Sequence, residues 1–129
     1  MSIDTNIKEA QNSNAFQSTK AGVISLAIKE KATLYSAYMP FVSGGGLFVP
    51  TTKHYQMGDE VFMLLSLPED NDKMNLAGKV VWINPVAQNG KPQGIGVQFN
   101  QNSSSQQLKD KIEIMLGNAI QSGHPTYTI

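Results

Sequence analysis

Three consecutive glycines, Gly44 to Gly46, follow Ser43 and form the strongest candidate for a ligand-binding turn. Successive backbone N–H groups in such a turn can converge on an anion such as a phosphate. Glycine runs also occur where the backbone needs a positive φ or must pass close to another group. Both interpretations remain open for this segment, and we favour a tight turn required for folding.

The side chains that most often carry out catalysis do not form a recognisable site. His54 and His124 are the two histidines, and neither belongs to a metal-ligand spacing. The carboxylates lie in polar turns, where nothing would raise a pKa, and no serine lies in a nucleophile motif. The segment from Gly94 to Gly96 begins like a dinucleotide fingerprint, but Phe99 occupies the third glycine position. The sequence therefore predicts a protein that is not an enzyme and has no cofactor or metal.

Two aromatic residues are candidates for contact with a protein partner. Trp82 is the single tryptophan and lies close to Pro85, and large rigid aromatic side chains dominate many protein interfaces. Strand alternation places Trp82 on the same face as Val80, so either core packing or partner contact explains it. Tyr35 lies in a short predicted helix with Leu34 and Tyr38, and that helix face either plugs one end of a barrel or stays exposed for docking.

The composition excludes several classes of function. The chain has 129 residues and a net charge of zero, so it lacks the basic surface that attracts nucleic acid. All ten basic residues are lysine, which leaves no arginine for a bidentate contact with phosphate or guanine. Cysteine is absent, and no apolar run suits a signal peptide or a membrane span. We expect a cytoplasmic protein with no direct membrane insertion.

Short segments with strand character recur along the middle of the chain and predict an all-β fold, a small antiparallel barrel. Residues 1–21 are polar and are expected to form a flexible tail, so that the domain occupies residues 22–129. A short helix is predicted at 31–38, between the first two strands. The expected strands cover residues 22–29, 47–49, 60–67, 76–83 and 94–99.

A single amphipathic helix is predicted at about 103–121. Ser103 and Gln106 match a capping box at its start, and Gly123 follows its end. Its apolar residues recur with helical spacing, which indicates packing against the barrel. They are Leu108, Ile112, Met115, Leu116, Ala119 and Ile120.

Four motifs, in this order, carry a family resemblance from about Gly22 to Tyr127. The sequence resembles a PilZ domain, and in particular the stand-alone branch of that family that acts in type IV pilus assembly. We therefore expect a PilZ-type barrel with a short helix after the first strand and a C-terminal helix. The motifs are S-x-x-G-L-F at 43–48, G-D-E-V-F at 58–62, G-K-V-V-W at 78–82 and G-I-G-V-Q-F at 94–99.

The resemblance implies a nucleotide site that this chain has lost. PilZ domains bind cyclic di-GMP through an R-x-x-x-R segment and a [D/N]-x-S-x-x-G turn, and the turn matches Phe41, Ser43 and Gly46 here. Phe41 cannot accept a hydrogen bond from guanine, and the arginine pair has no counterpart. We predict that cyclic di-GMP does not bind usefully; the alternative is a sensor that binds it through lysines at a non-standard site.

The resemblance also implies partners. Members of the pilus branch are adaptors that bind the pilus extension ATPase PilB and the degenerate GGDEF–EAL protein FimX, and they support pilus biogenesis and twitching motility. Exposed aromatic and proline residues carry the ATPase contact in that branch. The matching positions here are Tyr35, Trp82 and Pro85.

Overall fold

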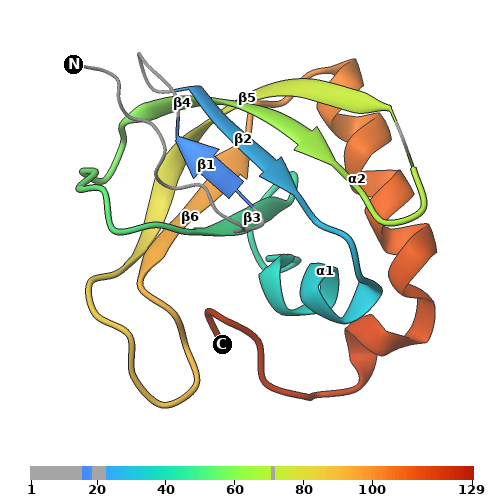
Figure 1. The fold of residues 1–129 in the computed structure, drawn as a ribbon. Coiled ribbons are helices and arrows are strands. Elements are labelled where there is room, and N and C mark those ends of the chain that lie inside the picture. Colours follow the sequence, from blue (N-terminus) through green and yellow to red (C-terminus); the bar gives the residue numbers. More distant parts are fainter. Residues whose placement is uncertain (1–15, 19–22, 71) are drawn as a thin grey trace.

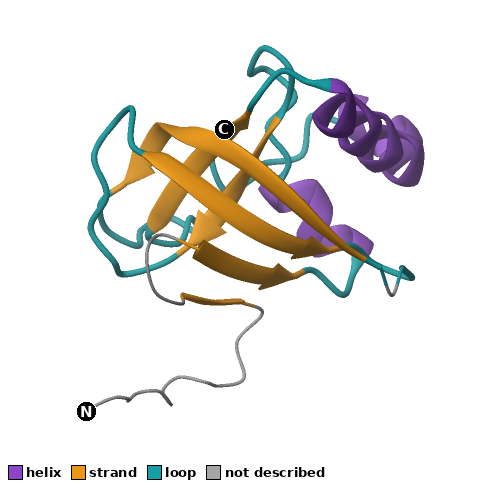
Figure 2. Ribbon diagram, turned by 90° about the horizontal axis from the view of Figure 1, so that it is seen from above, coloured by secondary structure: helices purple, strands orange, loops and turns teal. Residues whose placement is uncertain are grey.

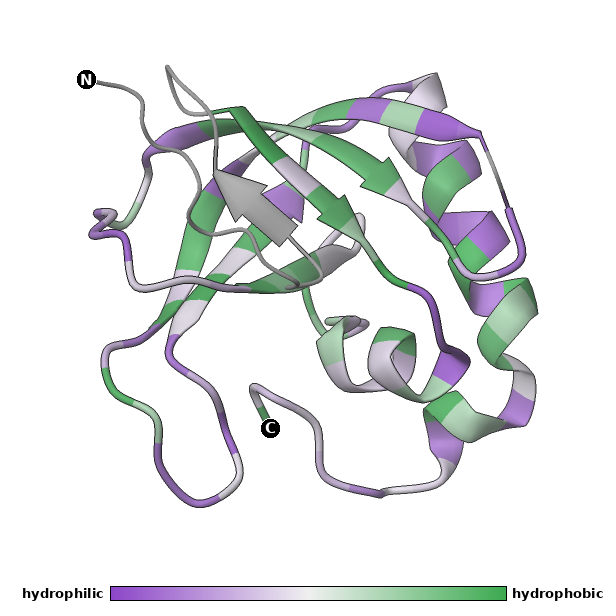
Figure 3. Cartoon of the chain, in the orientation of Figure 1, coloured by the Kyte–Doolittle hydropathy of each residue, from purple (hydrophilic) through white to green (hydrophobic). Residues whose placement is uncertain are grey.

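Alternating apolar residues bury one face of the strands that begin at Val23 and Glu60. The computed structural model describes residues 16–18, 23–70 and 72–129. In Figure 3 strands β2 (Val23–Ala27) and β4 (Glu60–Ser66) are mainly hydrophobic, whereas helix α2 (Ser103–Leu116) alternates between hydrophobic and hydrophilic residues. Alternation along residues 22–29 predicts that Ile24, Leu26 and Ile28 face inward, and the structure confirms this prediction. Residues of β4 and of β6 (Gly94–Phe99) join them in the core. These buried residues are Ile24, Leu26, Ile28, Val61, Met63, Leu65, Ile95, Val97 and Phe99.

In the described residues, six strands form one curled sheet with the order β1-β2-β4-β5-β6-β3 (Figure 1). The strands not yet given bounds are β1 (Phe16–Ser18), β3 (Gly46–Pro50) and β5 (Lys73–Asn84). Neighbouring strands are antiparallel except for β2 and β4, which are parallel. Strands β1 and β3 are the two edges of this sheet and are not neighbours in its order. The described strands therefore form a half-barrel and not a closed barrel.

The prediction of an antiparallel, all-β barrel is therefore confirmed only in part. The parallel pair follows from the long connection between β2 and β4, which contains a helix and β3. A connection of this length returns the chain in the same direction, whereas a tight hairpin would reverse it. Strand β5 also begins at Lys73, three residues before the expected start at Leu76. The fold is a mixed half-barrel with two helices.

Both helices lie on the same side of the curled sheet (Figure 2). Helix α1 (Lys31–Ala37) matches the predicted segment and buries Leu34 and Ala37. Helix α2 ends at Leu116, because Gly117 has a φ of 53° and begins a 3-10 turn, η2 (Gly117–Gln121). The predicted helix at 103–121 is thus an α-helix followed by a tighter turn. Within the described ranges, no helix combines the length and apolar character needed to cross a bilayer.

The N-terminal segment differs from the prediction at one place. Most of the expected tail at 1–21 lies outside the described residues, but Phe16–Ser18 form β1 and pair with β2. The sequence predicts a first strand that begins at Gly22, so β1 precedes the predicted first strand. Three residues are too few for an alternation pattern to be recognised, and the strand forms because the edge of β2 offers backbone partners.

The cap of helix α2 is also shifted from the predicted position. Asn102 has extended backbone angles, and its Oδ1 accepts a hydrogen bond of 2.9 Å from the backbone N–H of Ser105. Ser103 is already the first helical residue, and the side chain of Gln106 donates to Asp110. The predicted capping box of Ser103 and Gln106 is therefore wrong by one residue, and Asn102 is the cap.

This assignment predicts a difference between two neighbouring substitutions. Asn102→Ala should lower the free energy of unfolding by about 1 kcal/mol, because it leaves a backbone N–H of the first turn without its acceptor. Ser103→Ala should change that free energy by less than about 0.5 kcal/mol. Urea denaturation of both variants checks the prediction, and equal losses would contradict the cap assignment.

Candidate functional site

The glycine turn satisfies two separate backbone requirements. Gly44 and Gly45 have φ angles of 78° and 86°, which side chains rarely permit. A Cβ added to Gly46 would lie 2.7 Å from the backbone oxygen of Val97, so this glycine allows β3 and β6 to approach closely. Both reasons expected for a glycine run are confirmed. The N–H of Gly45 donates to Val42 O at 2.8 Å, so one amide of the turn is used within the turn.

Neutral side chains surround the exposed part of this turn. Gln98 donates from Nε2 to the backbone oxygen of Ser43 at 2.9 Å, and Gln101 donates to Ser43 Oγ at 3.4 Å. The stem of Lys109 packs near Gly45, but its ammonium forms an ion pair of 3.1 Å with Glu113. The local polar groups are therefore amides and a paired lysine.

Trp82 lies on the opposite face of β5 from the one that alternation predicts. The pairing of β5 with β6 shifts between Val80, opposite Val97, and Trp82, opposite Gly96. Val81 is the extra residue of this β-bulge, and a bulge re-aims the side chains that follow it. Val80 is buried in the core, whereas Trp82 is only half-buried. The prediction that Trp82 shares a face with Val80 is therefore wrong.

Phe41 and Trp82 form an aromatic pair at the surface. Their ring centroids are 5.7 Å apart with an interplanar angle of 63°, an edge-to-face arrangement. Phe41 is 48% exposed. A Cβ at Gly96 would lie 2.7 Å from the side chains of both Met39 and Trp82, so the glycine makes room for these two side chains. The turn, β5 and β6 together position these two rings.

The other predicted contact residues are placed elsewhere on the surface. Tyr35 is half-buried, and its hydroxyl donates to His124 O at 2.6 Å and accepts from Ser122 Oγ at 3.2 Å. Pro85 is exposed at the start of the loop between β5 and β6, where it borders a cleft of about 100 Å³. Tyr35 contacts the C-terminal segment, residues 122–129, whereas Trp82 contacts Phe41. The three predicted contact residues, Tyr35, Trp82 and Pro85, therefore do not form one cluster.

Sequence reasoning missed the role of Phe41 as a neighbour of Trp82. It identified Phe41 only as the position where a nucleotide contact is lost. An exposed aromatic residue in a glycine-rich turn was the available signal, because such a residue is unusual in a polar turn. Its partner is far away in the sequence and was not predictable from spacing.

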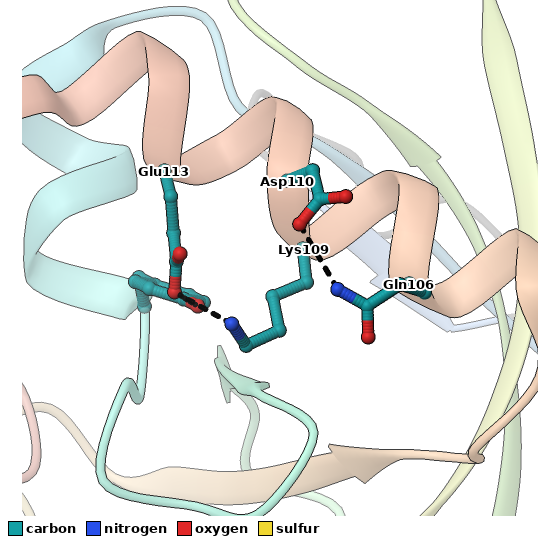
Figure 4. A network of polar contacts seen from close by, with 5 residues as sticks. Gln106, Lys109, Asp110 and Glu113 are labelled. Carbon is teal, nitrogen blue, oxygen red and sulfur yellow. Dashed lines mark hydrogen bonds and ion pairs between the residues drawn. The ribbon is translucent and has the colours of Figure 1, made fainter.

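A polar network joins helix α1 to helix α2 (Figure 4). The hydroxyl of Tyr38, the residue that caps α1, donates to Glu113 Oε2 at 2.6 Å, and Lys109 pairs with the same oxygen. Burial and then this hydrogen bond raise the pKa of Tyr38. The hydrogen bond from Tyr38 is the main cause that lowers the pKa of Glu113, and Lys109 adds to it. Tyr38 is buried, so it is a core residue and not part of an exposed helix face.

The described residues give no indication of a metal centre. No group of three or more histidine, cysteine or acidic side chains gathers within 16–18, 23–70 and 72–129. Lys111 forms an ion pair of 2.5 Å with Asp70. Lys111 lines a groove next to α2, and Asp70 lines a groove at the turn between β4 and β5.

Comparison with known families gives a match to the model described as PilZ domain, which covers residues 23–116. The match runs from β2 to the end of α2, and it includes the glycine turn and both rings of the aromatic pair. No curated protein shows significant similarity to the chain.

The Tyr38–Glu113 bond predicts a specific pH dependence. The folded pKa of Glu113 lies below its usual value of 4.5, so its contribution to stability is present above that pH and is lost as the pH falls through the lowered pKa. Tyr38→Phe should lower the free energy of unfolding by about 1 kcal/mol near neutral pH and by less at about pH 3.

Tyr35→Phe is the matched control, because the Tyr35 hydroxyl donates to a backbone oxygen that does not titrate. Its effect on stability should be the same at both pH values. Urea unfolding curves at each pH provide the measurement, and a pH-independent loss in Tyr38→Phe would contradict the assigned role of Glu113.

Proposed function

The chain belongs to the PilZ domain family, and from this premise we propose that it is an adaptor in type IV pilus biogenesis and twitching motility. PilZ domains are in general non-catalytic binding domains. The partners we propose are a PilB-like pilus extension ATPase and a FimX-like GGDEF–EAL protein, in the cytoplasm. On this proposal the protein acts through contact with other proteins and does not itself bind cyclic di-GMP.

The contact between Phe41 and Trp82 is the observation that carries this proposal. In the nucleotide-binding members of the family, the position of Phe41 holds an acidic or amide side chain. Here that position holds a phenyl ring, which packs 5.7 Å from the indole and has no group to bond guanine. The chain also has no arginine. Each charge-assisted contact is worth roughly 1.5 to 3 kcal/mol, so the loss of several would lower nucleotide affinity by orders of magnitude.

The aromatic pair has the properties of a protein-contact site. Trp82 Nε1 donates to Asn84 Oδ1 at 2.8 Å, so the indole N–H is already satisfied within the domain. What the pair offers to a partner is therefore apolar ring surface. Tryptophan is among the residues that most often carry binding energy in interfaces, where they form rigid anchors. Tyr35 and the exposed Pro85 are further contact residues that we propose, at separate places on the surface.

A cyclic di-GMP sensor with a non-standard site is the second candidate. The family match itself favours it, as do the retained Ser43 and Gly46 of the nucleotide turn. A lysine would have to replace the missing arginines, and Lys109 is the lysine that packs near the turn. Its ion pair with Glu113 would have to be broken, which weakens this alternative.

The adaptor proposal predicts the effect of removing either ring. Phe41→Ala and Trp82→Ala should each weaken binding to the purified extension ATPase of the same organism by about tenfold or more. Phe62→Ala is the matched control, because Phe62 is 49% exposed on β4 but belongs to a different part of the sheet. Calorimetric titration measures the affinities; folded Phe41 and Trp82 variants that bind as tightly as the unmodified protein would exclude the site.

The two candidates differ in their response to cyclic di-GMP. The adaptor proposal predicts no binding at micromolar concentrations, because neither guanidinium groups nor an acceptor at residue 41 are present. Titration of the free protein with the dinucleotide checks this. Micromolar affinity that is lost in Lys109→Ala would instead establish the sensor.

A further inference from the structure

We propose that Asn84 is a positioning residue that fixes the indole of Trp82 and couples it to the C-terminal segment. The inference rests on the proposed function in one respect, namely that Trp82 contacts a protein partner. The coupling itself is a property of the free protein. It assigns a role to a residue that neither the sequence motifs nor the family match single out.

Asn84 uses both ends of its amide. Its Oδ1 accepts from Trp82 Nε1 at 2.8 Å, and its Nδ2 donates to Pro92 O at 3.1 Å and to Tyr127 O at 2.9 Å. If the amide were flipped, its NH₂ group would face the indole N–H of Trp82, and its oxygen would face the carbonyl oxygens of Pro92 and Tyr127. One orientation of the amide is therefore favoured, and in that orientation its oxygen holds the indole in place.

The C-terminal segment holds Tyr127 O at a fixed point. Lys91 Nζ donates to Thr126 O at 2.7 Å, and the N–H of Tyr127 donates to Ser36 O in helix α1 at 2.9 Å. The ring of Tyr127 packs on Phe48, with centroids 5.6 Å apart, and Phe48 is fully buried. Figure 1 shows this end of the chain passing between α1 and the loop that joins β5 to β6. The acceptor for Asn84 is thus anchored from three sides.

The same segment also reaches the other proposed aromatic contact. Tyr35 donates its hydroxyl to His124 O at 2.6 Å, three residues before Tyr127. A displacement of the segment would therefore disturb Tyr35 directly and Trp82 through Asn84. Pre-organised side chains lose less freedom when they bind, so loss of the Asn84 contact should weaken partner binding roughly 2- to 10-fold.

The free protein provides the first test. The single tryptophan gives one indole N–H signal in a ¹H–¹⁵N spectrum and one fluorescence signal. Asn84→Ala should shift the N–H signal, speed its exchange with solvent and lower the fluorescence anisotropy of the ring. Asn75→Ala, an exposed asparagine on the same strand, should leave all three unchanged. Unchanged signals in a folded Asn84→Ala variant would overturn the proposal.

A double-variant comparison tests the coupling. Lys91→Met removes the anchor at Thr126 and should shift the Trp82 indole signal when Asn84 is present. In an Asn84→Asp background the indole acceptor remains but the donors to Tyr127 and Pro92 are gone, so Lys91→Met should then have little effect. If Lys91→Met shifted the indole signal equally with Asn84 and with Asn84→Asp, Asn84 would not transmit the displacement of the C-terminal segment. This comparison does not require that Asn84→Ala folds.

The partner measurement separates this inference from the proposed function. Asn84→Ala should weaken binding to the extension ATPase roughly 2- to 10-fold, and it should add nothing in a Trp82→Ala background. Undiminished affinity in the single variant would overturn the positioning role. An ATPase that does not bind the unmodified protein would instead refute the proposed function, while the indole measurements would still decide the coupling.

Discussion

The β-bulge at Val81 determines which face of β5 carries the tryptophan, and the candidate site depends on it. Without the extra residue, alternation would direct Trp82 to the same side as Val80, where Val97 fills the core. Such an indole would have to displace packed side chains, at a cost typical of an overfilled core. The bulge disrupts the ladder locally but places the ring opposite Gly96, which has no side chain to obstruct it. The glycine turn then brings Phe41 to the same ring.

Much of this architecture was predictable because it depends on local patterns. Alternation predicts the inward faces of β2 and β6. Pro40 limits the short helix α1, and the conformational freedom of glycine explains the backbone role of the three glycines. The order and direction of strands did not follow. Alternation gives the buried face of a strand but not its neighbour, so the parallel pairing of β2 with β4 was missed.

The errors at the candidate site have the same origin. Val80, Val81 and Trp82 read as an unbroken strand, because a bulge of one residue leaves no mark in a run of β-forming side chains. The contact of Phe41 with Trp82, and that of Asn84 with Tyr127, join residues far apart in the chain. The cap of α2 was missed by one residue because asparagine and serine are nearly equal as N-caps. The bulge and the two long-range contacts depend on tertiary structure, whereas the cap is a local contact for which the sequence offers two similar candidates.

The charge of the chain explains why fixed side-chain geometry should matter at such a site. With a net charge of zero and no arginine, the protein has little long-range field to steer a partner toward it. Affinity must then come from short-range contact, in which a few desolvated rings supply most of the binding energy. A ring that is free to rotate loses part of that energy when it is ordered on binding. The edge-to-face contact from Phe41 and the hydrogen bond to Asn84 restrain Trp82 from two sides in the free protein. A domain with no net charge can therefore still present a specific surface.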